Sequence, residues 1–186
     1  MFQSYLKLGI EHILDIGGAD HVLFLIALTV LYSIKEWRQV VILATAFTIG
    51  HSITLALSTL DKVSIAPDKI EFLIALTIFL AALFNLLKFK KEHKMTTRYL
   101  TALIFGFIHG MGFSNFFKSI LAKDSIILPL FSFNIGVEIA QIIIVLITLV
   151  ISWIIIEVFK IRKLYLIWSV SGIIVIWSLK LMFDRI

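Results

Sequence analysis

The sequence predicts an all-α fold, a polytopic bundle of transmembrane helices that forms a single integral membrane domain over residues 1–186. Of its 186 residues, 60% are hydrophobic and 16% are charged, with a mean hydropathy of +1.05. A soluble domain is about 45–50% apolar and about 25% charged. The apolar residues also form long blocks, several of which reach the roughly 20 residues that a helix needs to cross a bilayer core of about 30 Å. The lipid bilayer is therefore the first expected partner.

Each span is expected from one apolar block. The first block follows Asp20 and His21 through "VLFLIALTVLY", with room for a short helix before it. Pro67 precedes the third block, and Pro129 stands in the first turn of the fifth, where a helix tolerates proline. About six spans result, at residues 18–33, 40–60, 70–87, 99–121, 126–158 and 164–183.

The distribution of Lys and Arg predicts the orientation. Of the 17 Lys and Arg residues, ten fall in the loops after the first, third and fifth spans, and seven fall on the other side. The loop 88–98, "KFKKEHKMTTR", is the most basic of these segments. Because cytoplasmic loops carry the excess of Lys and Arg, we expect both termini to be extracytoplasmic. The net charge of +5 thus reflects membrane topology and does not indicate a nucleic-acid partner.

Ionisable and amide side chains lie inside the predicted spans, where they are costly and indicate function or pairing. Counted from the nearest loop at about 1.5 Å per residue, His51 and His109 lie about 20 Å and 16 Å from the inner edge. Asn134, Glu138 and Gln141 share one stripe of the fifth span, with Glu138 about 18 Å from the outer edge. The first span begins with Asp20 and His21, and His12 and Asp15 precede it. These residues are expected to share one slab between the outer interface and the midplane.

Glycines predict breaks and close contacts in the same region. Gly106 and Gly110 form a small-xxx-small pattern, which lets helices approach closely. Gly110 and Gly112 follow His109 and are expected to let the helix break there. Gly17-Gly18 indicates a similar break before the first span.

The donor set indicates a divalent transition metal ion. The chain has no cysteine, so thiolate sites are excluded, and imidazole with carboxylate suits Ni, Co, Zn or Fe(II). Proton transfer through a Glu–His relay would use the same residues. The chain carries no phosphate-binding loop of the Walker type, so ATP is not the expected direct driver.

Four segments together resemble the HupE/UreJ family of bacterial membrane proteins. They are "GIEHILDIGGADHVLFLIAL", "TAFTIGHSITLAL", "FGFIHGMGFSN" and "FNIGVEIAQ", in the family's order. The resemblance implies a multi-pass protein of the bacterial inner membrane that handles nickel or cobalt as a permease or uptake accessory. Carried over by position, it implicates as metal ligands His12, Asp20, His21, His51, His109 and Glu138. Two extra residues separate His12 from Asp20-His21 compared with the usual family block, so a direct role for His12 stays open.

Three functions remain open. The favoured one is a permease or uptake accessory for Ni, Co or Zn whose His/Asp/Glu site opens to the outer side. In that reading the ligands are supported by surrounding polar groups, namely Asp15, Thr48, Ser52, Asn134 and Gln141. The alternative is an intramembrane zinc-dependent hydrolase for a lipid or lipid-linked substrate, with Glu138 as general base. A scaffold would instead have a sealed, hydrogen-bonded polar core.

Overall fold

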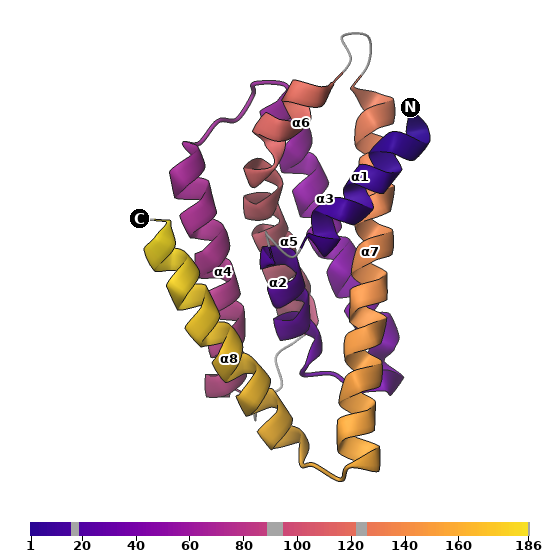
Figure 1. Ribbon diagram of the computed structural model, residues 1–186, viewed down its shortest axis with the longest axis vertical. Coiled ribbons are helices and arrows are strands. Elements are labelled where there is room, and N and C mark those ends of the chain that lie inside the picture. Colours follow the sequence, from indigo (N-terminus) through magenta and orange to yellow (C-terminus); the bar gives the residue numbers. More distant parts are fainter. Residues whose placement is uncertain (16–18, 89–94, 122–125, 186) are drawn as a thin grey trace.

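The computed structural model describes residues 1–15, 19–88, 95–121 and 126–185, and these ranges fold entirely into helices and their connections (Figure 1). The long helices are expected in lipid, because a helix satisfies every backbone polar group internally. The helices are α1 (Phe2–Leu14), α2 (Asp20–Thr29), α3 (Trp37–Thr59), α4 (Pro67–Lys88), α5 (Met95–Gly112), α6 (Ser114–Ile120), α7 (Ile127–Trp153) and α8 (Lys163–Asp184), with short turns η1 (Ile34–Glu36) and η2 (Ile154–Val158).

The predicted all-α membrane bundle is confirmed. Four segments of the described chain are long and apolar enough to cross a membrane: α3 with η1, α4, α7 with η2, and α8. The bent pair of α5 and α6 supplies a fifth, and α2 is a shorter apolar helix. The expectation of about six spans is therefore roughly consistent with this set, and α1 is the short helix that was expected to precede it.

The first apolar block forms a shorter helix than the predicted span 18–33. Helix α2 has 10 residues, which rise about 15 Å, half of a bilayer core of about 30 Å. It ends at Thr29, and the chain then turns into a capping box, in which Glu36 accepts hydrogen bonds from the backbone N–H and the hydroxyl of Ser33 at 2.8 and 3.0 Å. This box starts the next helix. Gly17 and Gly18, the predicted break on the other side of α2, lie outside the described residues.

The fourth span is broken where the glycines predict it. Helix α5 ends at Gly112, and α6 begins at Ser114 with a change of direction of 49°. Close approach at Gly106 is also confirmed, because a Cβ there would overlap the carbonyl oxygen of Phe47 on α3. Helices α3 and α5 are the most extensively packed pair, followed by α1 with α7 and α4 with α8.

Helix α2 lies in the middle of the bundle, and α1 crosses α7 obliquely near the upper end of Figure 1. The N-terminus and the end of α8 lie toward that upper end, and α2, α4 and α7 each end toward the lower end. Which end faces the cytoplasm remains a prediction from Lys and Arg.

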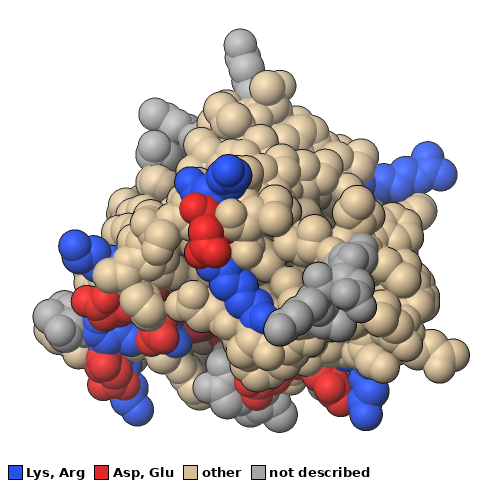
Figure 2. Space-filling view, turned by 90° about the horizontal axis from the view of Figure 1, so that it is seen from above, with Lys and Arg blue, Asp and Glu red and all other residues tan. Residues whose placement is uncertain are grey.

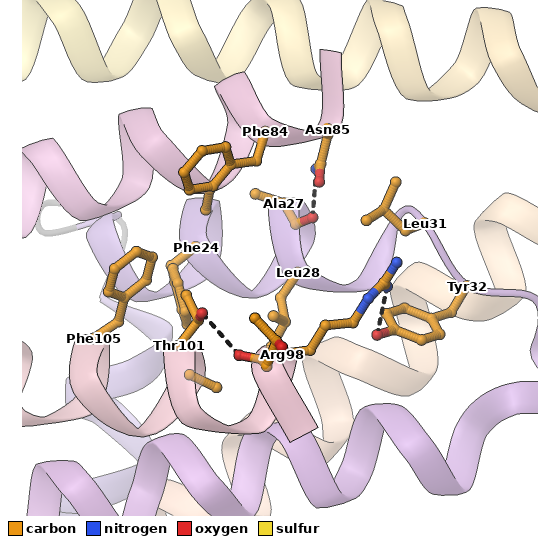
Figure 3. Close-up of a pocket in the computed structure, with 13 residues that line it drawn as sticks. Phe24, Ala27, Leu28, Leu31, Tyr32, Phe84, Asn85, Arg98, Thr101 and Phe105 are labelled. Carbon is orange, nitrogen blue, oxygen red and sulfur yellow. Dashed lines mark hydrogen bonds between the residues drawn. The ribbon is translucent and has the colours of Figure 1, made fainter. Parts of the chain in front are cut away.

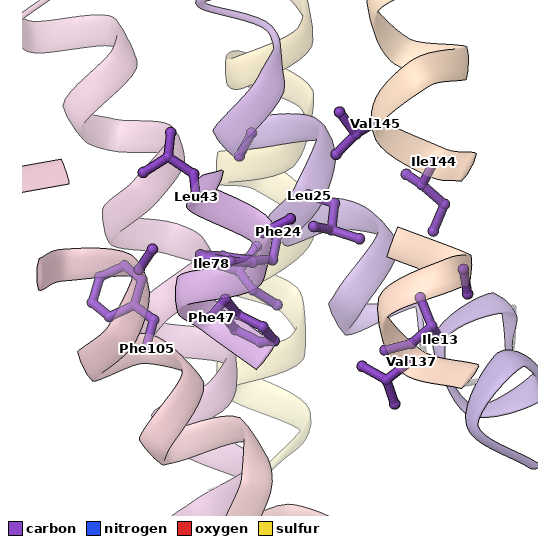
Figure 4. Close-up of a cluster of buried hydrophobic side chains, with 14 of the residues drawn as sticks. Ile13, Phe24, Leu25, Leu43, Phe47, Ile78, Phe105, Val137, Ile144 and Val145 are labelled. Carbon is purple, nitrogen blue, oxygen red and sulfur yellow. The ribbon is translucent and has the colours of Figure 1, made fainter. Parts of the chain in front are cut away.

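The interior is built from aromatic and aliphatic side chains that come from all eight helices, α1 to α8, and part of it is drawn in Figure 4. Phe24 and Phe47 are at most 1% exposed, and their ring centroids are 4.9 Å apart. The outward faces of α7 and α8 are apolar as well, with Ile147, Ile151 and Ile176 each more than half exposed. Such faces suit a lipid surrounding.

The upper end of the bundle carries acidic and basic side chains in small mixed groups (Figure 2). Lys7 pairs with Glu11 at 3.4 Å, and Lys118 pairs with Asp61. These exposed pairs stabilise the fold little, since the surface ion pairs of proteins contribute about 0–1 kcal/mol each.

Candidate metal centre

Three histidine rings from three helices meet in the interior. His12 near the end of α1, His21 in the first turn of α2 and His51 in α3 each offer a ring nitrogen, and these atoms lie within 4.8 Å of one another. The ring centroids of His12 and His21 are 4.6 Å apart, and His51 lies 5.8 and 5.9 Å from them. His21 and His51 are buried. The cluster therefore has the composition of a metal site, and it includes His12.

Most ring nitrogens of this cluster lack a hydrogen-bond partner in the described part of the chain. Among the described residues, Nε2 of His12, Nε2 of His21 and both nitrogens of His51 are buried without a partner. A buried polar group left unpaired costs about 1–3 kcal/mol. Burial, and next the neighbouring His21, also hold the pKa of His12 well below its ordinary value, so that this ring is neutral at pH 7. Neutral imidazoles with free lone pairs are the form that binds transition metals.

A fourth ring, His109 on α5, extends the cluster. Its centroid lies 5.2 Å from that of His21, and its Nε2 lies 2.9 Å from the hydroxyl of Thr77 on α4. That hydroxyl donates its hydrogen to the carbonyl of Ile74 at 2.7 Å. The Thr77 oxygen is therefore left to accept from Nε2–H, which places the free lone pair of His109 on the unpartnered Nδ1.

Glycine packing holds α3 and α5 together beside these rings. A Cβ at Gly110, the residue after His109, would overlap the carbonyl oxygen of His51 and the hydroxyl of Thr54. The backbones of the two helices thus touch where each carries a ring of the site. Phenylalanines surround the rings: Phe113 lies 4.0 Å from His12, and Phe133 stacks on His51 at 6.3 Å between centroids. This apolar shell keeps water away from the donors.

The donor spacing is compatible with a closed site after at most a small movement of the rings. Tetrahedral ligation at about 2.0–2.1 Å would place the nitrogens about 3.4 Å apart, and the nitrogens of the cluster lie within 4.8 Å of one another. Loading would therefore require the rings to move inward by at most about 1 Å, a change that rotation about χ2 can supply.

Asp20 lies next to the cluster but is held by a cation. One carboxylate oxygen of Asp20 accepts a hydrogen bond of 2.9 Å from Arg185 at the end of α8, while Oδ1 is buried without a partner in the described chain. Arg185 also donates to the carbonyl of Glu71 at 3.2 Å and lies 3.9 Å from its carboxylate. Asp20 could thus join a metal through Oδ1, or through both oxygens after Arg185 moves away.

Glu138 lies on a polar stripe rather than in the ring cluster. It accepts a 2.5 Å hydrogen bond from Thr45 on α3, and Thr45 precedes His51 by six residues, a rise of about 9 Å. Thr48, between these levels, donates to the side-chain carbonyl of Gln141 at 2.9 Å. Oε2 of Glu138 and Nε2 of Gln141 are buried without partners among the described residues. The stripe leads from the cluster along α3 and α7.

The remaining predicted supporting residues lie in different places. Ser52 donates to the backbone carbonyl of Thr48 at 2.7 Å, and the side-chain oxygen of Asn134 is buried without a partner among the described residues. Asp15 is exposed just after α1. The roles of all these residues, and of the six ligands carried over by resemblance, stay predictions.

Two features of the site were missed by sequence reasoning. Thr77 was not singled out, because one threonine in an apolar span is an ordinary residue. The pairing of Arg185 with Asp20 joins residues 165 positions apart, and no local pattern indicates it. The usable signal was that both residues fall on the predicted outer side.

Comparison with known proteins agrees with the four quoted motifs. The model of the family described as HupE / UreJ protein matches residues 1–184, nearly the whole chain. No curated protein and no solved structure matches the chain.

Proposed function

The chain belongs to the HupE/UreJ family, and from this premise we propose that it is a permease or uptake accessory for a divalent transition metal ion. Metal transport is the activity that the family implies. The ion is substrate, and it would be held first by His12, His21 and His51, whose ring nitrogens converge within 4.8 Å. His109 and Asp20 border this group and would serve as further donors.

The unpartnered ring nitrogens are the observation that carries this proposal. A scaffold with a sealed polar core would use its histidines as hydrogen-bond donors and acceptors between helices. Here both nitrogens of His51 are buried without a partner among the described residues. Unpaired polar groups of this kind destabilise the fold and are found mainly at functional sites. A metal ion that accepts these nitrogens as ligands would offset the loss.

The stripe along α3 and α7 supports a permease over the zinc hydrolase. A hydrolase needs its general base beside the metal-bound water, and Glu138 was the predicted base. Its carboxylate instead accepts from Thr45, about 9 Å along α3 from His51. The side chains of Gln141 and Glu138, which contact Thr48 and Thr45, each keep one polar atom without a partner among the described residues. Such a series of weak binding groups suits the stepwise movement of an ion.

The ligand atoms favour metal ions of intermediate softness as the transported substrate. Imidazole nitrogen with carboxylate or amide oxygen suits Ni, Co or Zn, whereas Cu(I) prefers sulfur. Family membership favours nickel or cobalt among these. Since the chain has no Walker-type phosphate loop, movement would follow the ion gradient and the membrane potential.

Uptake into proteoliposomes tests the proposal. Vesicles holding the purified protein would be assayed with Ni²⁺, Co²⁺ and Zn²⁺ in parallel, using His51→Ala and His109→Ala. We expect each variant to lose at least tenfold in initial rate, since outer-shell changes alone cost about 10–100-fold. His93→Ala is the matched control, because the sequence predicts that histidine in a loop. Unchanged uptake in both site variants would reject the proposal.

A further inference from the structure

A separate, partly open cavity lies beside Phe24. It has a volume of about 270 Å³ and is lined by residues of α2, of the turn after α2, and of α4 and α5 (Figure 3). Phe24 forms part of its wall, and the ring of Phe24 lies 5.5 Å from that of His109. The four clustered histidines do not line this cavity. It is therefore a distinct feature, and nothing in the metal centre explains it.

The cavity is apolar at one end and cationic at the other. Figure 3 shows Phe24 and Phe105 at one end, with Arg98 and Tyr32 at the opposite end. Asn85 also lines the wall, but its amide already donates to the carbonyl of Ala27 at 2.8 Å. Arg98 at the opposite end is charged and has hydrogen-bonding capacity that remains open.

The guanidinium of Arg98 is oriented by Tyr32. Nη1 donates to the phenolic oxygen at 2.7 Å, and the guanidinium carbon lies 5.2 Å from the ring centroid. Nε is buried and has no partner in the described part of the chain. With Nη1 occupied, the edge formed by Nε and Nη2 remains open, and that edge can bind a carboxylate or phosphate through two parallel hydrogen bonds.

Within the described ranges, no carboxylate forms an ion pair with this charge. The ion pairs of residues 1–15, 19–88, 95–121 and 126–185 do not include Arg98. An arginine stays charged under all ordinary conditions. An uncompensated charge among apolar walls is costly, and an anion at the open edge would remove that cost.

We infer that this cavity binds an anionic amphiphile, with its carboxylate or phosphate head on the open edge of Arg98 and its alkyl chain toward Phe24. The apolar walls between the two ends, including Leu28 and Phe105, receive the chain. Each methylene that leaves water contributes about 0.8 kcal/mol, or about fourfold in affinity. The head alone would bind weakly, and the alkyl chain alone would leave Arg98 unpaired.

The inference is tested with metal-free protein, so the result does not depend on whether the protein transports a metal ion. The protein in a non-ionic detergent is titrated with dodecanoate, dodecyl phosphate and dodecanol, and the complexes are counted by native mass spectrometry. We expect both anions to bind one per chain and dodecanol to bind at least tenfold more weakly. Competition by phosphatidylglycerol would identify a phospholipid as the source of the ligand, and failure to compete would identify a free single-chain amphiphile.

Variants separate the specific site from detergent-like adsorption. Arg98→Gln is expected to weaken dodecanoate binding at least tenfold, and Arg98→Lys less, because lysine keeps the charge but loses the two-bond edge. Arg38→Gln is the matched control, since Arg38 stacks on Trp37 at 5.5 Å and does not line the cavity. Equal binding of dodecanol and dodecanoate, or equal losses in the two glutamine variants, would overturn the inference. If Arg98→Gln fails to fold, the dodecanol comparison and Arg98→Lys still decide.

Discussion

Replacing Gly110 by alanine should damage the metal centre through packing alone. The new Cβ would lie closer than 3.0 Å to the backbone carbonyl of His51, a separation that Cβ atoms essentially never show. The carbonyl belongs to the middle of α3, so relief requires α3 and α5 to move apart. The shift of several tenths of an ångström exceeds the tolerance of about 0.2 Å in metal–ligand distances.

Two measurable losses follow for Gly110→Ala. Overpacking costs about 1–3 kcal/mol, which should appear as a lower melting temperature in detergent. Displacement of His51 should raise the Kd for Ni²⁺ or Zn²⁺, measured by calorimetric titration, at least tenfold. Gly172→Ala is the matched control, because a Cβ there meets nothing within 4 Å. If Gly110→Ala melts and binds metal like Gly172→Ala, the close contact between α3 and α5 does not exist as described.

Three further changes test separate parts of the site. Thr77→Val removes the acceptor for His109 Nε2 and should weaken metal binding about 10–100-fold. The control is Thr148→Val, which should leave metal affinity unchanged, because the hydroxyl of Thr148 bonds to a carbonyl of its own helix. Equal effects of the two changes would reject the inferred tautomer of His109. Arg185→Gln should tighten metal binding severalfold by releasing Asp20 and removing a nearby positive charge, and an unchanged Kd would show that their ion pair does not compete with the metal. Metal affinity should stay nearly constant as the pH falls from 7 through the ordinary histidine pKa of about 6.5, because burial holds the pKa of His12 well below that value, and it should weaken only at lower pH, where protons compete for the ring nitrogens; affinity that falls in step with the ordinary histidine pKa would contradict ligation by buried, neutral rings.

The fold was predictable because a bilayer leaves few alternatives. Long apolar blocks must become helices in lipid, and the break after His109 followed from Gly110 and Gly112. The length of α2 was not predictable from hydropathy, since residues 30–32 are as apolar as the helix before them. These residues instead form a turn, in which the N–H of Tyr32 donates to the carbonyl of Thr29 at 2.9 Å, and the capping box of Ser33 and Glu36 follows it; a count of apolar residues detects neither feature.

The sequence indicated which polar residues lie in the region of the site, but it did not indicate which of them lie next to one another. Counting depth along each helix placed His51 and Glu138 in the same slab, but depth does not give the direction in which a side chain points. The structure groups His51 with His12 and His21 and leaves Glu138 with Thr45. His12 enters the cluster because α1 lies across α7, an arrangement that depends on long-range packing.

The central claim is that His12, His21 and His51 bind one divalent metal ion together. X-ray absorption at the metal edge of the Ni²⁺- or Zn²⁺-loaded protein tests it most directly. We expect one ion per chain with at least three imidazole nitrogens, at about 2.0–2.1 Å for zinc, and the loss of one imidazole in His51→Ala. An oxygen-only coordination shell, or a spectrum that His51→Ala leaves unchanged, would contradict the account.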